Sequence, residues 1–196
     1  MDKSKLLTQL EKECLSCTRC EIGGCQISTD AGCFLSNVFS NMCMKARIMV
    51  VGQNPGAREI EQRRPFVGPS GANFDRAIKE VLGLDRSHFY ITNTVHCFTQ
   101  SNRKPFNKEI EMCRYFLDRE VKVVDPVVII TLGGPALQQV TGVRGIQKHH
   151  AQPLVSARYG KPVLPLYHTS PLNMNHADRK EAFYKGLEKL QEYLGG

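Results

Sequence analysis

The sequence has no long uninterrupted hydrophobic run. Its longest apolar run, residues 121–132, contains a lysine, an aspartate and a proline, so no stretch is long enough to cross a bilayer. The first five residues, MDKSK, lead into a mixed polar helix pattern and not into the apolar region of a signal peptide. We therefore expect a soluble, intracellular protein of the cytoplasm with no membrane partner.

Internal repeats, linkers and low-complexity tracts are also missing. A length of 196 residues suits one globular domain, 1–196, which can bury a core without disulfides. The 41% of hydrophobic and 23% of charged residues are ordinary for a globular protein and argue against disorder. The net charge of +7 favours a polyanionic partner, although a basic protein without such a partner fits the charge equally well.

Cysteine, by contrast, is abundant, and six of the eight cysteines lie between positions 14 and 43. A disulfide scaffold has little support because the chain shows no export signal. Metal ligation by thiolates is the better explanation for several of them. Residues 1–45 are thus interpreted as a cysteine-bearing N-terminal segment that precedes an α/β body.

The body alternates apolar runs with amphipathic stretches. Strands are predicted at 47–52, 89–95, 127–132 and 162–167, and helices at 70–82, 107–124 (capped by Asn107) and 176–194. This alternation predicts a three-layer αβα fold around a central four-stranded parallel sheet. Ligands bind beyond the carboxyl ends of such strands. Four loops leave that edge, and they begin at these residues: Gly52, Asn93, Gly133 and His168.

Six motifs stand in or near these loops. They are VGQNPG (51–56), RPFVGPSG (64–71), YITNTVHC (90–97), NRKPFNKEIEMC (102–113), DPVVIITLGGPA (125–136) and HTSPLNMN (168–175). In this order they resemble the uracil-DNA glycosylase superfamily, and most of all its iron–sulfur family, family 4. The resemblance covers most of the chain. It implies a monofunctional DNA-repair glycosylase that flips uracil out of DNA and hydrolyses its N-glycosidic bond, leaving an abasic site for base excision repair. We expect a nucleoid-associated monomer that acts on single- or double-stranded DNA.

The resemblance also implies a [4Fe–4S] cluster. Cys97 and Cys113 show the sixteen-residue separation of the family, and Cys17 and Cys20 match its N-terminal C-x2-C pair. Cys14 with Cys17 is a competing register, and a zinc ion with four cysteine ligands satisfies the same spacing. The cluster would tie the N-terminal segment to the loop after the second strand and to the next helix. Three further cysteines have no family counterpart and are expected to be unreactive thiols: Cys25, Cys33 and Cys43.

Base recognition would fall to Phe66 and Asn93, with Gln53 and Ser170 as further substrate contacts. A glycosylase lifts its target out of the duplex into a pocket, and the flipped pyrimidine needs a flat apolar face to stack on. Phe66 matches the family's stacking phenylalanine. Asn93 matches the residue whose amide accepts from N3–H of uracil and donates to O4. A core phenylalanine and a turn-forming asparagine are the plainer interpretations.

Bond cleavage would depend on His168 and Asn54. The imidazole of His168 matches the family histidine that donates to O2 of the departing base, by the logic of an oxyanion hole. Asn54 stands where another branch of the superfamily has an aspartate, and where family 4 usually reads GEAPG. An amide cannot take a proton at neutral pH, so we expect Asn54 only to orient a water, with slower turnover. Glu59 and Glu61 follow this motif without a clear family match.

Leu172 resembles the residue that wedges into the duplex as the base leaves. An exposed leucine without a function is the alternative. Because Gly56 replaces a blocking tyrosine of other branches, hypoxanthine, xanthine or mismatched thymine are alternative target bases. A module that binds damaged DNA without cutting it, and a zinc-ribbon regulator built on residues 14–25, are the alternatives outside this activity.

Overall fold

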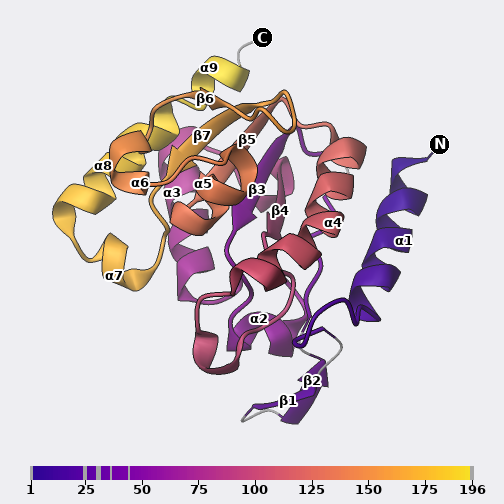
Figure 1. The fold of residues 1–196 in the computed structure, drawn as a ribbon. Coiled ribbons are helices and arrows are strands. Elements are labelled where there is room, and N and C mark those ends of the chain that lie inside the picture. The colour runs from indigo at the N-terminus through magenta and orange to yellow at the C-terminus, as the bar shows by residue number, and fades with distance from the viewer. Residues whose placement is uncertain (1, 24–25, 30–31, 36, 44, 195–196) are drawn as a thin grey trace.

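In this computed structural model the chain forms a five-stranded sheet with helices on both faces (Figure 1). The structure describes residues 2–23, 26–29, 32–35, 37–43 and 45–194, and for 26–29, 32–35 and 194 it describes the backbone alone. The strand order is β4-β3-β5-β7-β6. The strands run as follows: β3 Ile48–Gly52, β4 Phe89–Asn93, β5 Val128–Leu132, β6 Leu154–Val155 and β7 Pro162–Leu166.

The four predicted strands are all present and pair in parallel. The fifth strand, β6, was not predicted; it adds two residues antiparallel to β7 at the edge of the sheet. Its sequence carries little signal, because Leu154 is only half-buried and Val155 is 70% exposed. The three-layer αβα prediction is confirmed, with five strands in place of four.

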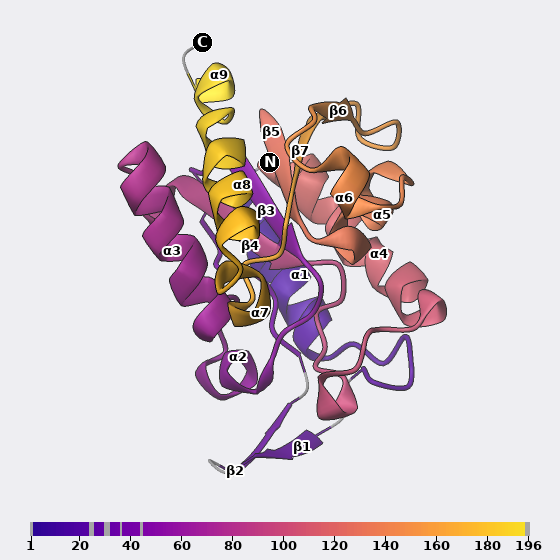
Figure 2. The same cartoon turned by 90° about the vertical axis from the view of Figure 1, so that its left-hand side faces the viewer.

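The sheet side chains alternate between two cores. Met49, Tyr90 and Ile129 face the layer formed by α1, α4 and α5. Val50 and Ile130 face the opposite layer of α3 and α8. Figure 2 shows these two helical layers on either side of the sheet. Their bounds are α1 Lys3–Leu15, α3 Pro69–Leu82, α4 Asn107–Val124, α5 Gly134–Thr141 and α8 Ala177–Glu188.

The remaining elements are short. They are β1 Gln26–Thr29, β2 Gly32–Leu35, α2 Ala57–Gln62, η1 Arg86–His88, η2 Gln100–Asn102, α6 Ile146–His149, α7 Pro171–Met174 and α9 Gln191–Leu194. The predicted terminal helix is therefore divided into α8 and α9. In the described ranges, no helix combines the length and the apolarity that a membrane crossing requires.

The predicted cap of α4 is wrong by one residue. Asn107 is the first helical residue, and the cap position belongs to Phe106. A carboxylate oxygen of Glu109 accepts the backbone N–H of Phe106 at 2.6 Å, which is the bond that the third helical residue makes in a capping box.

The N-terminal segment contacts the body directly. Helix α1 packs on α4, and the hydroxyl of Tyr115 donates to the carboxylate of Glu13 at 2.9 Å. The side-chain amide of Asn37 donates to the carbonyl of Cys14 at 2.7 Å. These contacts place the end of α1 beside the strand-edge loops.

Parallel pairing sets Gly52 opposite Asn93 at the carboxyl ends of β3 and β4. The backbone N–H of Thr94 and that of Val95 continue this ladder to the carbonyls of Gly52 and Gln53, at 2.9 and 3.0 Å. The first two predicted loops are thus held side by side.

Candidate active site

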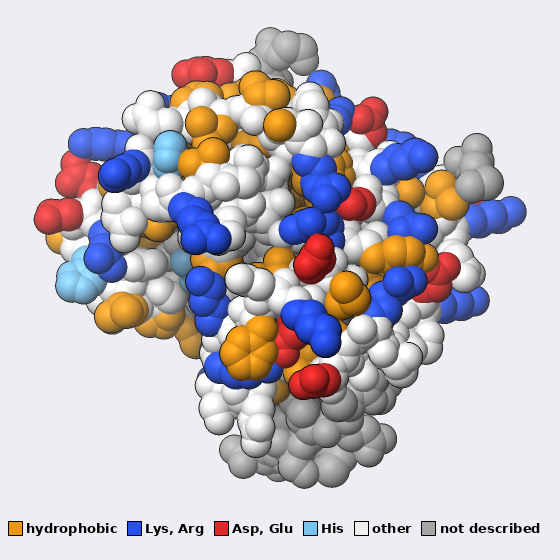
Figure 3. All heavy atoms as spheres, in the orientation of Figure 1, with side chains coloured by type: hydrophobic (Ala, Val, Ile, Leu, Met, Phe, Trp, Pro, Cys, Tyr) orange, Lys and Arg blue, Asp and Glu red, His pale blue; other side chains and the backbone are white. Residues whose placement is uncertain are grey.

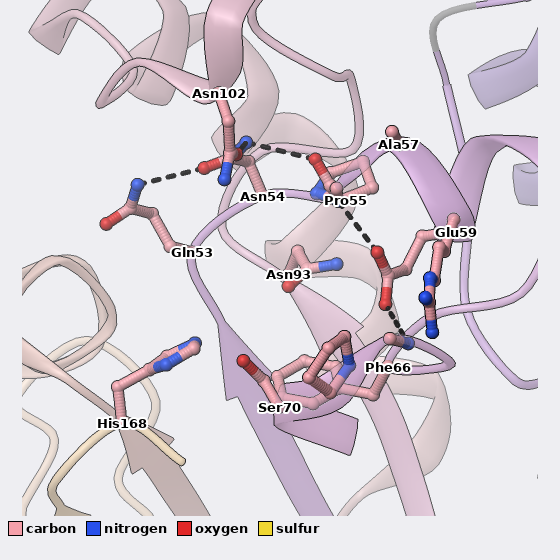
Figure 4. Close-up of a pocket in the computed structure, with 14 residues that line it drawn as sticks. Gln53, Asn54, Pro55, Ala57, Glu59, Phe66, Ser70, Asn93, Asn102 and His168 are labelled. Atoms are coloured by element: carbon pink, nitrogen blue, oxygen red, sulfur yellow. Dashed lines mark hydrogen bonds between the residues drawn. The ribbon is translucent and has the colours of Figure 1, made fainter. Parts of the chain in front are cut away.

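A cavity of about 360 Å³ opens at the carboxyl ends of β3, β4 and β7 (Figure 4). Five of the residues predicted as catalytic or substrate-binding line it: Gln53, Asn54, Phe66, Asn93 and His168. Ser70, Glu59 and Asn102 complete much of the remaining polar wall. The structure therefore gathers, around one cavity, residues that lie more than one hundred positions apart.

Ser170 and Leu172 do not line this cavity. Ser170 is the cap residue of α7, and its backbone N–H is bonded to His168. Leu172 lies on α7 and is 72% exposed. A wedge requires such exposure, whereas direct contact of Ser170 with a base in the cavity has no support in this arrangement.

Asn93 has an unpartnered side-chain amide. The residue is 1% exposed, and neither Oδ1 nor Nδ2 has a hydrogen-bond partner. Figure 4 shows the amide in the middle of the ring of lining residues. Buried polar groups are nearly always paired, and leaving one unpaired costs roughly 1–3 kcal/mol. An amide kept unpaired at a cavity wall is suited to a ligand that carries one donor and one acceptor.

Phe66 is held in a constrained backbone conformation. Its φ of 55° lies in the left-handed region, which is costly for a residue with a side chain. The guanidinium of Arg86 donates to the carbonyl of Pro65 at 3.0 Å and also to the carbonyl of Phe66. A Cβ on Gly71 would lie 1.8 Å from the Phe66 carbonyl oxygen, so only glycine fits there. These contacts fix the buried ring, whose centre lies 6.3 Å from that of His168.

His168 presents one ring nitrogen as a donor. Its Nδ1 accepts the backbone N–H of Ser170 at 3.1 Å, so the proton of the neutral ring sits on Nε2. Burial lowers the pKa of His168, and the charge of Glu59 opposes this shift without reversing it. Gly133, with φ of 89°, lets the loop after β5 pass close behind the ring, where a Cβ would lie 3.3 Å from Cβ of His168.

Asn54 is turned toward the η2 turn. Its Oδ1 accepts from Nε2 of Gln53 at 2.9 Å. Its Nδ2 donates to the carbonyl of Pro55 at 3.1 Å and to Oδ1 of Asn102 at 3.3 Å. The amide is thus fixed on the cavity wall, with one lone pair of Oδ1 left for a further donor such as water.

Glu59, which has no role assignable from sequence, connects two motifs. Its carboxylate accepts the backbone N–H of Gly56 at 3.0 Å, of Val67 at 2.9 Å and of Gly68 at 2.7 Å. It therefore joins the 51–56 loop to the segment that carries the stacking ring. A Cβ on Gly56 would lie 2.8 Å from Oε2 of Glu59, so any larger residue at position 56 would require the Glu59 carboxylate to shift.

A second pocket brings the N-terminal cysteines to the body. Five cysteines line it: Cys14, Cys17, Cys20, Cys97 and Cys113. Both predicted ligand registers are thus present at one place, with Cys14 being 1% exposed. Burial raises the pKa of the Cys14 thiol, and the nearby sulfurs of Cys113 and Cys97 raise it further. The donor set is soft and consists of thiols, which suits iron–sulfur or zinc ligation.

The five cysteine side chains that line this pocket do not form a coordination shell in this structure. Among the described residues, no group of three or more His, Cys, Asp or Glu side chains has a metal-holding arrangement. Cys43 lies elsewhere, and its Sγ donates to the carbonyl of Ser87 at 2.8 Å. Cys25 and the side chain of Cys33 lie outside the described residues.

His96 and Glu120 form a buried ion pair next to Cys113. Nδ1 of His96 is 3.2 Å from Sγ of Cys113, and Nε2 is 3.1 Å from a carboxylate oxygen of Glu120. Tyr90 donates its hydroxyl to the other oxygen of Glu120 at 2.9 Å. Burial acts to lower the pKa of His96, but Glu120 and Cys113 outweigh it and raise that pKa to about 10. This pair was not predicted, because its members are 24 positions apart.

Comparison with known proteins points to the same family that the sequence motifs resemble. A model of the uracil DNA glycosylase superfamily matches residues 39–191. A type-4 uracil-DNA glycosylase of Sulfurisphaera tokodaii is 33% identical over an alignment of 200 positions, which covers 94% of this chain and 84% of that protein. Those of Thermotoga maritima and Archaeoglobus fulgidus are 32% and 27% identical, over 77% and 96% of this chain and 79% and 94% of their own. The chain therefore belongs to the uracil-DNA glycosylase superfamily.

Proposed function

We propose that the protein is a monofunctional uracil-DNA glycosylase, which flips uracil out of DNA and hydrolyses its N-glycosidic bond. The unpartnered amide of Asn93 carries this proposal. Uracil offers an N3–H donor beside the O4 acceptor, and an amide pairs with both at once. Cytosine presents the reverse pattern, so it leaves the buried amide unsatisfied and is rejected. Phe66, fixed at the cavity wall, provides the face on which the flipped ring stacks.

His168 acts on the departing base. Negative charge develops on the uracil ring as the glycosidic bond breaks, and O2 carries much of it. The neutral imidazole donates its Nε2 proton in a hydrogen bond to O2, because Nδ1 is occupied by Ser170. A fixed donor in a water-poor site stabilises such charge more than bulk water does.

Among the described residues that line the cavity, Glu59 is the only carboxylate that could act as a base on the attacking water. Both of its oxygens are engaged by backbone N–H groups. We therefore assign Asn54 the role of orienting the water through Oδ1, after most of the bond has broken. Charge stabilisation then contributes most of the rate acceleration, and turnover is slow.

We further propose that Cys17, Cys20, Cys97 and Cys113 hold a [4Fe–4S] cluster. The spacing of these cysteines and their placement around one pocket support this assignment. The cluster would supply thiolate–iron bonds that join the N-terminal segment to the loop after β4 and to α4. It takes no part in bond cleavage, because none of the four cysteines lines the active-site cavity.

The test is product analysis on single-stranded and duplex oligonucleotides that carry one uracil, with the protein as purified. We expect free uracil and an alkali-labile site on both substrates, from a monomeric enzyme that works in the cytoplasm on nucleoid DNA. Thymine, cytosine and hypoxanthine substrates are the controls. Uracil as the poorest substrate would overturn the assignment of the base. Tight uracil-DNA binding without any alkali-labile product would identify a non-cleaving module, which the amide at position 54 favours.

A further inference from the structure

Two exposed hydrophobic side chains lie close in the sequence to residues that line the cavity. In the part of the chain that the structure describes, four large hydrophobic residues are exposed: Phe106, Met112, Val155 and Leu172. Leu172 follows the cavity residue His168 by four positions, and Phe106 follows the cavity residue Asn102 by four positions. Leu172 already has a role as the expected wedge. Phe106, at the start of α4, has none.

The Phe106 ring is held firmly although it is 62% exposed. The guanidinium carbon of Arg103 lies 3.9 Å from the ring centre, so a cation covers one face of the ring. Arg103 is itself fixed by two hydrogen bonds to the carboxylate of Glu109, at 2.9 and 2.6 Å. The same carboxylate accepts the backbone N–H of Phe106. The ring therefore has a defined position against the Arg103–Glu109 pair.

Folding alone gives no reason for an aromatic residue at this place. Helix cap positions favour Ser, Thr, Asp or Asn, whose side chains accept backbone N–H groups, and a phenylalanine ring accepts none. Most of the ring is also exposed, so Phe106 contributes little to the core. An exposed aromatic ring that already stacks with an arginine on one face leaves its other face available to a base, as in proteins that bind single strands.

The surroundings of Phe106 are basic. Arg103, Lys104, Lys108 and Glu109 lie within three positions of it, and because Glu109 pairs with Arg103, the two exposed lysines supply the net positive charge. Figure 3 shows Lys and Arg side chains interspersed with hydrophobic ones, and with several Asp and Glu side chains, over the start of α4. Aromatic rings among cationic side chains form the surfaces that bind single-stranded nucleic acids, where bases stack and phosphates pair with the cations.

We propose that Phe106, backed by Arg103, is a stacking platform for an unpaired base that neighbours the flipped nucleotide on the same strand. This inference rests on the proposed function, since the flipped nucleotide fixes which strand passes Asn102. A base in a duplex is already stacked and paired, so the platform favours single-stranded substrate. Leu172 and Phe106 then engage DNA at separate points of the cavity rim.

The test measures binding of the full-length protein to a fluorescein-labelled single strand that carries 2′-fluoro-arabino-deoxyuridine, a uracil nucleotide resistant to cleavage. Loss of one stacked base is expected to weaken binding by roughly five- to one-hundredfold. We expect this loss for Phe106→Ala on single strands and a smaller loss on duplex. Phe106→Trp should retain the affinity. Val155→Ala removes an equally exposed side chain on β6 and should bind like the parent protein.

An abasic scan identifies the partner base. Each base next to the uracil is replaced in turn by a tetrahydrofuran abasic residue. At one position this change should weaken DNA binding by the parent protein as much as Phe106→Ala does. It should not weaken binding by the Phe106→Ala variant any further. Equal affinities of Phe106→Ala and Val155→Ala, or an abasic effect of the same size in both the parent protein and Phe106→Ala, would overturn the platform. A strand with thymine in place of uracil separates this result from the proposed function, whose failure appears as equal binding of the two strands by the parent protein.

Discussion

Nδ1 of His168 accepts the backbone N–H of Ser170 at 3.1 Å, at the point where the chain turns into α7. The side-chain amide of Asn173 donates to the carbonyl of His168 at 2.8 Å and fixes the same turn from its other side. These contacts determine both the orientation of the imidazole and the nitrogen that carries its proton. The sequence HTSPLN thus encodes a donor of defined direction, because the first turn of α7 occupies the other nitrogen.

The substitution His168→Asn should lower the single-turnover rate of uracil excision by on the order of 10²–10³-fold, as expected for loss of one donor to a developing anion. Binding of uracil-DNA should change far less, because Phe66 and Asn93 remain. His88→Asn, which alters an exposed histidine on η1 outside the cavity, is the matched control. Equal excision rates for the two variants would remove His168 from the reaction.

The pH dependence of stability offers a second test of the neutral ring. Burial lowers the pKa of His168 in the folded protein below its ordinary value of 6.5. The unfolded chain therefore takes up a proton near pH 6.5 that the folded protein refuses. The contribution of this residue to stability should be complete above pH 7 and should fall as the pH drops through 6.5. Denaturant unfolding from pH 8 to 5 should show a shallower decline for His168→Asn than for the parent protein, and parallel curves would contradict the neutral ring.

Much of the fold follows from local sequence patterns. The strands at 48–52 and 128–132 are continuous apolar runs because both faces of the sheet are covered, and such runs are visible in the sequence. Strand β6 was missed because two residues at an exposed edge leave no periodic pattern. The cap of α4 was misplaced because Glu109, and not the residue at the cap, satisfies the backbone.

The residues of the candidate active site also fall into two groups, those that a sequence motif identifies and those whose role only the fold reveals. Phe66, Asn93 and His168 were identified because each lies within a contiguous motif. The roles of Glu59 and Arg86 were not, because their partners are backbone atoms eight to twenty-one positions away that only the folded chain brings near. Polarity in a sequence shows that a group can bond, but it does not show with which backbone atom.

The unpartnered amide of Asn93 predicts a conflict between stability and activity. Replacing it with leucine removes two unsatisfied polar atoms and keeps a side chain of similar shape. Asn93→Leu should therefore raise the free energy of unfolding, by roughly 1–3 kcal/mol, while abolishing uracil excision. Denaturant melts and single-turnover assays on one preparation measure both quantities. A destabilised Asn93→Leu protein would show that the amide has a structural partner.

A second variant, Asn93→Asp, tests the selectivity for uracil over cytosine separately from the stability cost of the buried amide. It keeps the acceptor for N3–H but loses the donor to O4. The ratio of uracil to cytosine excision should therefore fall toward one. An unchanged ratio would exclude Asn93 from base recognition even if the leucine variant behaves as expected.

Glu59 should matter for both the cavity and the fold. Glu59→Ala leaves three backbone N–H groups without their acceptor and should cost roughly 2–4 kcal/mol of stability. Because the segment that carries Phe66 loses its link to the 51–56 loop, kcat/KM should fall on the order of 10–100-fold. Glu61→Ala, on the same helix α2 but not among the cavity-lining residues, is the control. If both variants have the same free energy of unfolding and the same kcat/KM, the hydrogen bonds of the Glu59 carboxylate contribute to neither quantity.

The cysteine pocket makes the ligand register testable one sulfur at a time. Serine in place of Cys17, Cys20, Cys97 or Cys113 should remove iron and the brown colour, because three thiolates hold a cubane cluster poorly. Cys14→Ser should retain iron, since Cys17 and Cys20 are the N-terminal pair assigned as ligands although Cys14 lines the same pocket, and Cys43→Ser should retain it because that sulfur bonds to Ser87. Iron, sulfide and zinc are measured on each purified variant. Loss of iron from Cys14→Ser together with retention in Cys20→Ser would move the cluster to the other register, and stoichiometric zinc in the parent protein would replace the cluster with a zinc site.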